Sequence, residues 1–266
     1  MPEMPELEVV RRRLGPRVVG RTVEDVVVSP RLGFLLRATT AQLQGLAGAI
    51  AGELWRRGKW LVLDADPVHL VINPMLGGRF QWAQPGEKVM AATVFQVVLD
   101  GGEELRYTDT ARMGRVYLAE GGDWSQVHGW TDMGPEAVDI GAEEFAGRIR
   151  RHPGELKNLL RNQSFVAGVG NAYSDEILHH AQLLPLRKRS TLKPDDVSRL
   201  HASTRTVLAD AVAAIEAQPD WVSHKQDRSF MRVHMKGGQA CPRCGHRISE
   251  LTARGEVTNF CRGCQF

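Results

Sequence analysis

Four cysteines near the end of the chain constrain its fold more than any other feature. Cys241 and Cys244 form one Cys-x-x-Cys pair, Cys261 and Cys264 form a second, and sixteen residues separate the pairs. This spacing is typical of a zinc site with four thiolate ligands, in which a hairpin brings two knuckles together. A pair of disulfides is the alternative, but no signal peptide precedes the globular sequence, and an intracellular chain keeps its thiols reduced. The sequence therefore predicts one structural zinc ion.

The composition permits a nucleic-acid partner and argues against a membrane protein. The formal net charge is +3, and 42% of the 266 residues are hydrophobic, enough for two modest cores and a metal-held appendage. The longest apolar runs are strand-sized, far short of the roughly 20 residues that span a bilayer. Basic residues outnumber acidic ones around the cysteine pairs, which suits a phosphate backbone. We expect a monomeric, cytoplasmic, nucleoid-associated protein without a targeting signal.

Hydrophobic periodicity divides the chain into three parts. Short alternating segments predict strands at residues 23–28, 50–55, 61–64, 69–72, 79–82, 93–99 and 115–118, with a helix at 40–46. Helical spacing predicts further helices at residues 5–14, 143–151, 156–162, 173–181 and 194–217, the first ending before Gly15 and Pro16. The expected fold class is multidomain α+β. Its parts are an N-terminal two-layer β-sandwich at residues 2–120, a linker at 121–134, a helical domain at 135–222 and a zinc-finger domain at 223–266.

The first residues predict an amine nucleophile. Removal of Met1 would expose Pro2 as the N-terminal residue. An α-amino group has a reference pKa near 7.7 to 8.0, so roughly a quarter of it is unprotonated at pH 7.4, against about a thousandth of a lysine. A secondary amine that attacks an aldehyde-level carbon forms a cationic iminium, which favours elimination. Glu3 lies beside the amine as a general acid and Glu6 lies one helical turn further on. The alternative is that Pro2 is only a common second residue.

A glycine-rich segment at residues 165–171 predicts an anion site. Gly168 and Gly170 precede a helix, where free N–H groups and the positive helix end attract a phosphodiester. Lys157 and Asn171 flank the segment. Tight packing between two helices is the alternative explanation. Lys59 is expected on an otherwise apolar strand of the β domain, where a single lysine usually faces solvent.

Taken together, these motifs resemble the Fpg/Nei family of bifunctional DNA glycosylases over almost the whole chain. The family's Pro-Glu-x-Pro-Glu opening stands at residues 2–6, and its strand lysine stands at Lys59. Its helix-two-turn-helix signature stands at residues 168–173 with Glu176 beyond, and its four-cysteine finger is followed by Gln265. Four motifs in the family's order make a chance match a poor explanation.

The resemblance implies a helix-two-turn-helix domain and excision of a damaged base from double-stranded DNA. Pro2 would attack C1′ of a flipped nucleotide, and β,δ-elimination would then nick the strand. Glu3 would assist opening of the sugar ring, and Lys59 would hold the phosphate beside the lesion. The residues expected to grip the DNA backbone are Lys157, Gly170 and Asn171.

Two loops depart from the pattern of the Fpg branch. Where that branch has a methionine wedge that fills the gap left by the flipped base, this chain has Ile72. The stretch at residues 73–77 instead is similar to the endonuclease VIII branch, so Met75 and Leu76 are expected to form the wedge. The family's Arg-Arg-Phe-Gly loop is Ala-Arg-Met-Gly at residues 111–114, which leaves Arg112 and Met113 as the second inserting pair.

Two further departures concern the finger and the loop before it. Glu256 stands where the family has a phosphate-binding arginine, so a reversed charge would face DNA, and only Arg254 is near enough in sequence to compensate. The stretch at residues 221–238 is several residues shorter than the loop that closes over 8-oxoguanine in the Fpg branch. This difference favours oxidised pyrimidines or another lesion as the substrate.

Two other classes of function stay open at this point. One is a catalytically silent protein of the same fold that binds damaged or structured DNA without cutting it. The other is an unrelated zinc-ribbon protein, for instance of the translation apparatus. Retention of Met1 would bury the Pro2 nitrogen in a peptide bond and would favour the silent protein.

Overall fold

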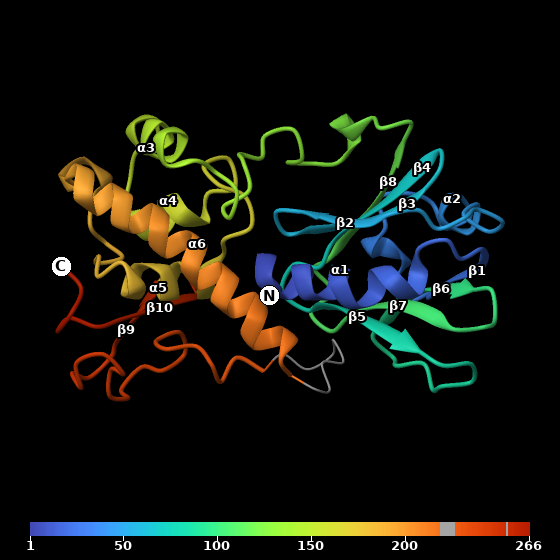
Figure 1. Cartoon of the computed structure of the whole chain (residues 1–266). Helices are drawn as coiled ribbons and strands as arrows, with labels where there is room; N and C mark the ends of the chain where they lie inside the picture. The colour runs from blue at the N-terminus through green and yellow to red at the C-terminus, as the bar shows by residue number, and fades with distance from the viewer. Residues whose placement is uncertain (219–226, 254) are drawn as a thin grey trace. The chain divides into compact units, whose positions relative to one another are not determined.

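The structure is a computed structural model that describes residues 1–218, 227–253 and 255–266 (Figure 1). It contains two compact units, one formed by Met1–Thr131 with Ile215–Gln226 and the other by Asp132–Ala214 with Asp227–Phe266. Every helix in the described part of the chain is too short or too polar to cross a lipid bilayer.

The first unit contains one long helix and two antiparallel sheets. The helix is α1 (Met4–Val18). One sheet has the strand order β2-β3-β4-β8, with bounds Leu54–Arg57, Trp60–Ala65, Val68–Asn73 and Arg115–Glu120. The other has the order β1-β6-β7-β5, with bounds Val23–Val28, Thr93–Leu99, Glu104–Asp109 and Gly78–Ala83. The short helices are α2 (Thr40–Gln44), capped by Thr39, and the 3-10 turns η1 (Gly33–Leu35) and η2 (Trp124–Gln126).

The two sheets and α1 share one hydrophobic core, which confirms the expected sandwich. Leu61 and Leu70 come from one sheet, Phe80 and Phe95 from the other, and all four are almost completely buried. The inward face of α1 enters the same core through Leu7, Val10, Leu14 and Val18.

The first helix is longer than the sequence predicts. It continues through Gly15 and Pro16 to Val18, whereas a proline inside a helix removes one hydrogen bond and costs about 3 kcal/mol. Val18 is fully buried in the core, and Arg13 donates hydrogen bonds to two backbone carbonyls at the end of α6 and just beyond it. The packing of the last helical turn therefore outweighs the tendency of Pro16 to end the helix.

Strand β7 was missed because its sequence does not alternate in polarity. Arg106, in the middle of the strand, has no exposed surface. Its guanidinium pairs with Glu104 at 2.6 Å and donates to the carbonyl oxygens of Glu87 and Lys88. A buried charged residue interrupts the hydrophobic alternation, so the pattern does not predict this strand.

The second unit contains the helices and the finger. The four α-helices predicted there are confirmed within two residues at each end: α3 (Ala142–Arg151), α4 (Leu156–Arg161), α5 (Asn171–His180) and α6 (Pro194–Glu216), with the 3-10 turn η3 (Arg189–Thr191) before α6. A hairpin of β9 (Ser249–Ala253) and β10 (Glu256–Phe260) forms the finger, and α5 packs against both α4 and β10.

A cluster of tryptophans fixes much of the predicted linker. Trp124 and Trp130 stack with ring centroids 4.5 Å apart and planes inclined by 13°. Both meet the edge of Trp55 on β2, at 5.6 and 5.7 Å. Residues 124–130 therefore belong structurally to the first unit, whose boundary falls at Thr131.

Candidate functional site

Pro2, Glu3 and Glu6 lie together at the start of α1. Pro2 is buried, and Glu3 and Glu6 are 1% and 2% exposed. The Glu6 carboxylate accepts a hydrogen bond from the backbone N–H of Glu3 at 2.9 Å. This contact belongs to a capping box, so Glu6 fixes the backbone next to Pro2.

An arginine connects this helix to the turn that carries Lys59. The Arg56 guanidinium lies 3.3 Å from the Glu8 carboxylate on α1 and donates to the carbonyl oxygen of Gly58 at 3.0 Å. Burial alone would raise the pKa of Glu8, but hydrogen bonds from Arg11 and Arg12 lower it to about 2. Glu8 is therefore ionised at neutral pH, and its ion pair with Arg56 holds the hairpin against α1.

Lys59 does not lie on a strand, which corrects the sequence prediction. The chain leaves β2 at Arg57 and enters β3 at Trp60, and these two residues pair across the hairpin. Gly58 and Lys59 form the turn between them, and Gly58 has a φ of +55°, which a residue with a Cβ adopts only at a cost. Lys59 is half-buried at the tip of the hairpin instead of on a sheet face.

The four predicted wedge residues lie on two loops, and one residue of each loop is an exposed apolar side chain. The first loop follows β4, where Met75 has a φ of +44° and donates its N–H to the Asn73 side chain. Leu76 is 52% exposed. The second loop follows β7, where Arg112 has a φ of +55° and Met113 is 46% exposed.

Asp109 organises the second loop, a role that no pattern in the sequence indicates. Its carboxylate is 1% exposed and accepts hydrogen bonds from four successive backbone N–H groups, those of Ala111, Arg112, Met113 and Gly114, at 2.6 to 3.0 Å. A carboxylate that accepts several backbone N–H bonds is a strong local anchor. The loop therefore presents its side chains from a fixed backbone.

Glycines bring the two loops into direct contact. A Cβ at Gly77 would overlap Ala111 and the Asp109 carboxylate, and a Cβ at Gly78 would overlap the Tyr107 hydroxyl. The first loop therefore packs on the base of the second, although the two are more than thirty residues apart in sequence. The structure therefore brings together the two loops that carry the four predicted wedge residues.

Lys157 and Asn171 turn their donors toward the finger. The Lys157 ammonium lies 2.6 Å from Asp175 and 3.1 Å from the carbonyl oxygen of Val257 on β10. Asn171 donates to the same carbonyl oxygen at 3.0 Å. Burial lowers the pKa of Lys157, while the charge of Asp175 opposes the shift. Both side chains thus join the helical domain to the finger, whereas Gly170 stands as the N-cap of α5.

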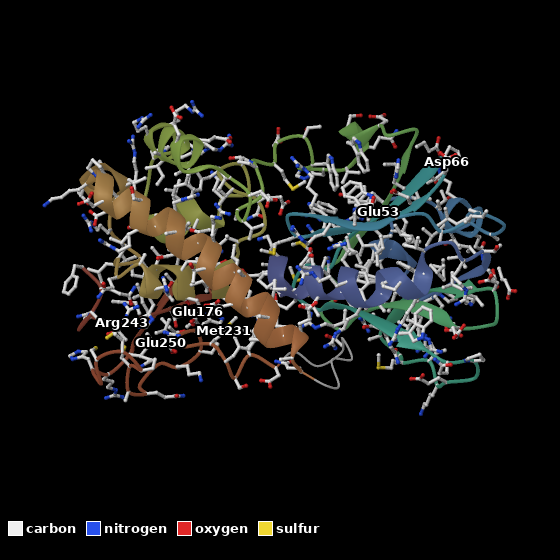
Figure 2. The ribbon with its side chains drawn as sticks, in the orientation of Figure 1. Glu53, Asp66, Glu176, Met231, Arg243 and Glu250 are labelled. Atoms are coloured by element: carbon white, nitrogen blue, oxygen red, sulfur yellow. The ribbon has the colours of Figure 1, made fainter. Side chains whose placement is uncertain are left out.

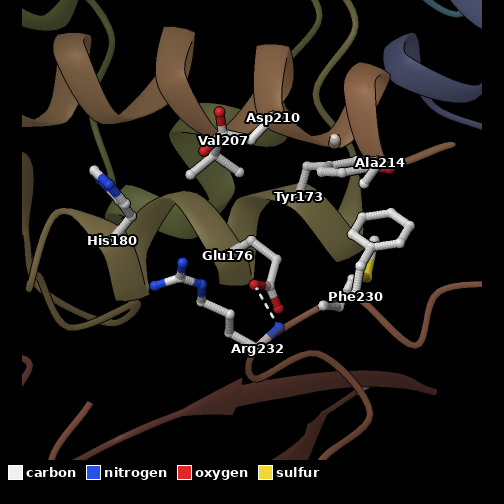
Figure 3. Close-up of a pocket in the computed structure, with 10 residues that line it drawn as sticks. Tyr173, Glu176, His180, Val207, Asp210, Ala214, Phe230 and Arg232 are labelled. Carbon is white, nitrogen blue, oxygen red and sulfur yellow. Dashed lines mark hydrogen bonds between the residues drawn. The ribbon is translucent and has the colours of Figure 1, made fainter. Parts of the chain in front are cut away.

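Two neighbouring carboxylates on α5 hold the segment that leads into the finger. Asp175 is fully buried and contacts His234 at 2.9 Å as well as Lys157. Glu176 accepts the backbone N–H groups of residues 232, 233 and 234, each at 2.8 Å, and Figure 3 shows the first of these bonds. Glu176 entered the sequence prediction only as part of a signature, and Asp175 was missed.

A pocket of about 150 Å³ lies between α5, α6 and residues 230–232 (Figure 3). Its lining includes Tyr173, Glu176, Asp210 and Met231, two of which Figure 2 labels. None of the predicted catalytic residues lines it. The pocket therefore belongs to the framework between α5, α6 and the segment before the finger, and the predicted chemistry lies in the first unit.

The four cysteines converge as the spacing predicts. Their sulfur atoms all lie within 4.8 Å of one another, with Cys241 and Cys264 3.8 Å apart and Cys244 and Cys261 3.5 Å apart. A tetrahedral ion with metal–sulfur bonds of about 2.3 Å requires sulfur atoms about 3.8 Å apart. The sulfur cluster therefore fits one metal ion with four thiolate ligands.

Glu256 has a partner that the sequence did not suggest. Its carboxylate forms a two-pronged ion pair with Arg161 of α4, with one N–O distance of 2.5 Å. The hydrogen bond from Arg161 lowers the pKa of Glu256, against a smaller effect of burial. The expectation that only Arg254 compensates Glu256 is wrong, because the compensating charge comes from α4. Arg254 itself lies outside the described residues, as does the stretch at 219–226 within the loop that suggested oxidised pyrimidines.

Family models match all three parts of the chain. The formamidopyrimidine-DNA glycosylase N-terminal domain matches residues 1–116, its H2TH domain matches residues 133–219, and the zinc finger found in FPG and IleRS matches residues 238–265. Fold and site thus define a helix-two-turn-helix protein with a β-sandwich and a C-terminal zinc finger.

Full-length relatives and solved structures agree with this class. The chain is 35% identical to the formamidopyrimidine-DNA glycosylase of Heliobacterium modesticaldum over 277 residues, covering all of both chains. It is 34% identical to that of Symbiobacterium thermophilum, covering all of this chain and 89% of the relative. MutM in complex with DNA containing carbocyclic 8-oxo-G superposes with a TM-score of 0.88 at 26% identity, over all of both chains. Lactococcus lactis Fpg in complex with abasic-site DNA also has a TM-score of 0.88 at 26% identity, over 99% of both chains.

The chain belongs to the formamidopyrimidine-DNA glycosylase family. The resemblance inferred from four sequence motifs is confirmed. This membership removes the unrelated zinc-ribbon alternative.

Proposed function

We propose that this protein is a DNA glycosylase with lyase activity, which removes a damaged, oxidised base from double-stranded DNA and nicks the strand. The observation that carries the proposal is the arrangement at the start of α1, where Pro2 and Glu3 are buried side by side and Glu6 fixes the backbone between them. The relatives named as formamidopyrimidine-DNA glycosylases support it over the full length of the chain.

The chemistry begins once Met1 is removed and Pro2 carries a free secondary amine. The Pro2 nitrogen attacks C1′ of a flipped nucleotide, the bond from C1′ to the base breaks, and the base leaves with the bonding electrons and takes up a proton. Loss of the amine proton and opening of the sugar ring give the iminium, with Glu3 donating a proton to O4′. Loss of a proton from C2′ then expels the 3′-phosphate, and a second elimination expels the 5′-phosphate.

Lys59 and the two loops supply positioning. At the hairpin tip, which Arg56 holds against α1, Lys59 binds the phosphate beside the reacting sugar. Leu76 and Met113 enter the base stack together with Met75 and Arg112, filling the space of the flipped nucleotide. The contact between the loops keeps this wedge rigid, so less ordering is needed when it enters DNA.

The second unit binds the DNA backbone. Gly170 at the start of α5 offers backbone N–H groups to a phosphate, and Lys157 and Asn171 hold the finger against that helix. We assign zinc to the four thiolates, because a tetrahedral all-cysteine site is typical of structural zinc. We infer that one copy of the chain suffices.

Single-turnover cleavage of duplexes that each carry one lesion tests the proposal. The set contains oxidised pyrimidines, oxidised purines, an abasic site and undamaged DNA, with intact mass used first to establish that Met1 is absent. We expect the protein to nick the abasic-site duplex with elimination of both phosphates. We also expect it to excise at least one oxidised base faster than an undamaged base. Tight binding of the abasic duplex without cleavage by protein that lacks Met1 would establish the silent DNA-binding protein instead.

A further inference from the structure

We propose that His179 is part of the metal centre, where it donates a hydrogen bond to two of the metal-bound sulfur atoms. His179 lies on α5, 62 residues before Cys241, and its side chain is completely buried. Its Nε2 atom is 3.3 Å from the sulfur of Cys241 and 3.7 Å from the sulfur of Cys264. The inference rests on the proposed zinc ion at the four cysteines.

The chemistry of bound thiolates fixes which ring nitrogen carries the proton. Four cysteine ligands bind a metal as thiolates, which have no proton to donate. Any hydrogen bond between the ring and the sulfurs must therefore come from an N–H at Nε2. The other nitrogen, Nδ1, is buried and has no hydrogen-bond partner among the described residues. The sulfurs are thus the partners that explain a polar ring at this buried position.

The position of the ring suits a donor better than a ligand. Nε2 lies against the edge of the sulfur cluster formed by Cys241 and Cys264, whose sulfurs are 3.8 Å apart. Four thiolates already complete a tetrahedral site. An N–H shared between two bound thiolates draws off part of their negative charge, and partners of this kind typically change metal affinity by about 10-fold to 100-fold.

This contact also couples the metal to the helical domain. Arg243, labelled in Figure 2, stands between the first two cysteines and donates to the carbonyl oxygens of His179 and His180 at 2.7 and 3.3 Å. Asn171 binds the finger strand β10 at the other end of α5. Metal binding in the finger and order in α5 therefore stabilise each other.

Zinc competition with a coloured chelator tests the proposal on the full chain. His179→Phe keeps an aromatic ring and removes the donor, whereas His179→Gln keeps an N–H at similar reach. The first variant should lose zinc affinity by about 10-fold or more, and the second should stay within about threefold of the wild type. His180→Phe is the matched control, because His180 bonds to Ser203 and not to sulfur. A control that loses as much affinity as His179→Phe, or a His179→Phe with wild-type affinity, overturns the proposal.

Cadmium-113 NMR of the wild-type chain gives a second test that needs no variant. The cadmium shift should report four sulfur ligands, and the Nε2 proton of His179 should show coupling to the metal across the N–H···S bond. A shift that reports three sulfurs and one nitrogen would show that His179 is a metal ligand. Absence of the coupling would show that the N–H···S hydrogen bond is not formed. Either result overturns the proposal. Metal content of the wild type is measured separately, so a chain that binds no zinc would contradict the zinc assignment itself.

Discussion

Arg161 and Glu256 form a two-pronged ion pair across 95 residues of sequence, joining α4 to the first residue of β10. Glu256 is 49% exposed and Arg161 is 26% exposed, so water and salt weaken the pair. The pair contributes little to folding stability. We expect its effect to be on DNA binding, because Glu256 neutralises the charge of Arg161 beside the surface proposed to bind DNA.

Replacing Glu256 should therefore strengthen DNA binding by releasing Arg161. We expect Glu256→Gln to tighten binding and to steepen the dependence of log Kd on log salt by about one phosphate equivalent. Arg161→Gln should weaken binding, because it leaves Glu256 uncompensated. Salt titrations of both variants on one abasic duplex check this, with Glu250→Gln as a finger control. An unchanged salt slope in Glu256→Gln would place the pair away from DNA.

Asp109→Asn should loosen the second wedge loop. An amide has one acceptor oxygen where the carboxylate has two, so about half of the four N–H groups lose their partner. Each lost bond to a charged group costs about 1.5 to 3 kcal/mol. Urea unfolding should show a loss of about 3 kcal/mol, and single-turnover base excision should slow. Asp123→Asn, an exposed aspartate that caps Ser125, should change neither.

Leu76→Ala and Met113→Ala test the composite wedge. Because both side chains are exposed, each change should leave folding stability within about 0.5 kcal/mol of the wild type. Excision of a paired, lesion-containing nucleotide should slow about tenfold or more, since a few kcal/mol of unstacking is no longer offset. Phe34→Ala removes another exposed apolar side chain of the same unit and serves as the control. Excision at the wild-type rate by the double variant Leu76→Ala, Met113→Ala would show that these side chains do not act as a wedge.

Lys157→Met tests whether Lys157 stabilises the second unit through its ion pair with Asp175 or contacts a DNA phosphate directly. Removing one member of a buried ion pair costs about 3 to 5 kcal/mol, because Asp175 loses its closest cation. We expect a lower melting temperature for the second unit, weaker DNA binding and an unchanged salt slope. Lys188→Met, at an exposed position, should leave the melting temperature unchanged. A stable Lys157→Met protein whose salt slope falls by about one would instead show that Lys157 contacts phosphate.

Local patterns in the sequence predict much of the fold and part of the candidate site. Helix α6 was predicted within one residue, because its period is regular and Lys193-Pro194 marks its start. The cysteine cluster followed from spacing alone. The wedge residues remain a prediction from the family resemblance, and the sequence did not show that their two loops meet at Gly77 and Gly78.

Partners distant in sequence explain what was missed. The sequence predicts no strand around Arg106, because the carbonyl oxygens that bury this charge lie almost twenty residues earlier. Arg161 contacts Glu256, and His179 contacts Cys241, only in the folded chain, where the finger packs against α4 and α5. The apolar pattern predicts a strand at Lys59 because a two-residue turn has no hydrophobic signature, although Gly58 beside it indicates the turn.

Mapping of a borohydride-trapped adduct shows which residue of the protein forms the covalent bond to the abasic sugar. Protein whose intact mass shows removal of Met1 is incubated with an abasic-site duplex, reduced and digested, and the modified peptide is sequenced by mass spectrometry. We expect the deoxyribose remnant to be attached to the nitrogen of Pro2, with little adduct formed by Pro2→Gly. An adduct carried by a lysine, with trapping undiminished in Pro2→Gly, would contradict it.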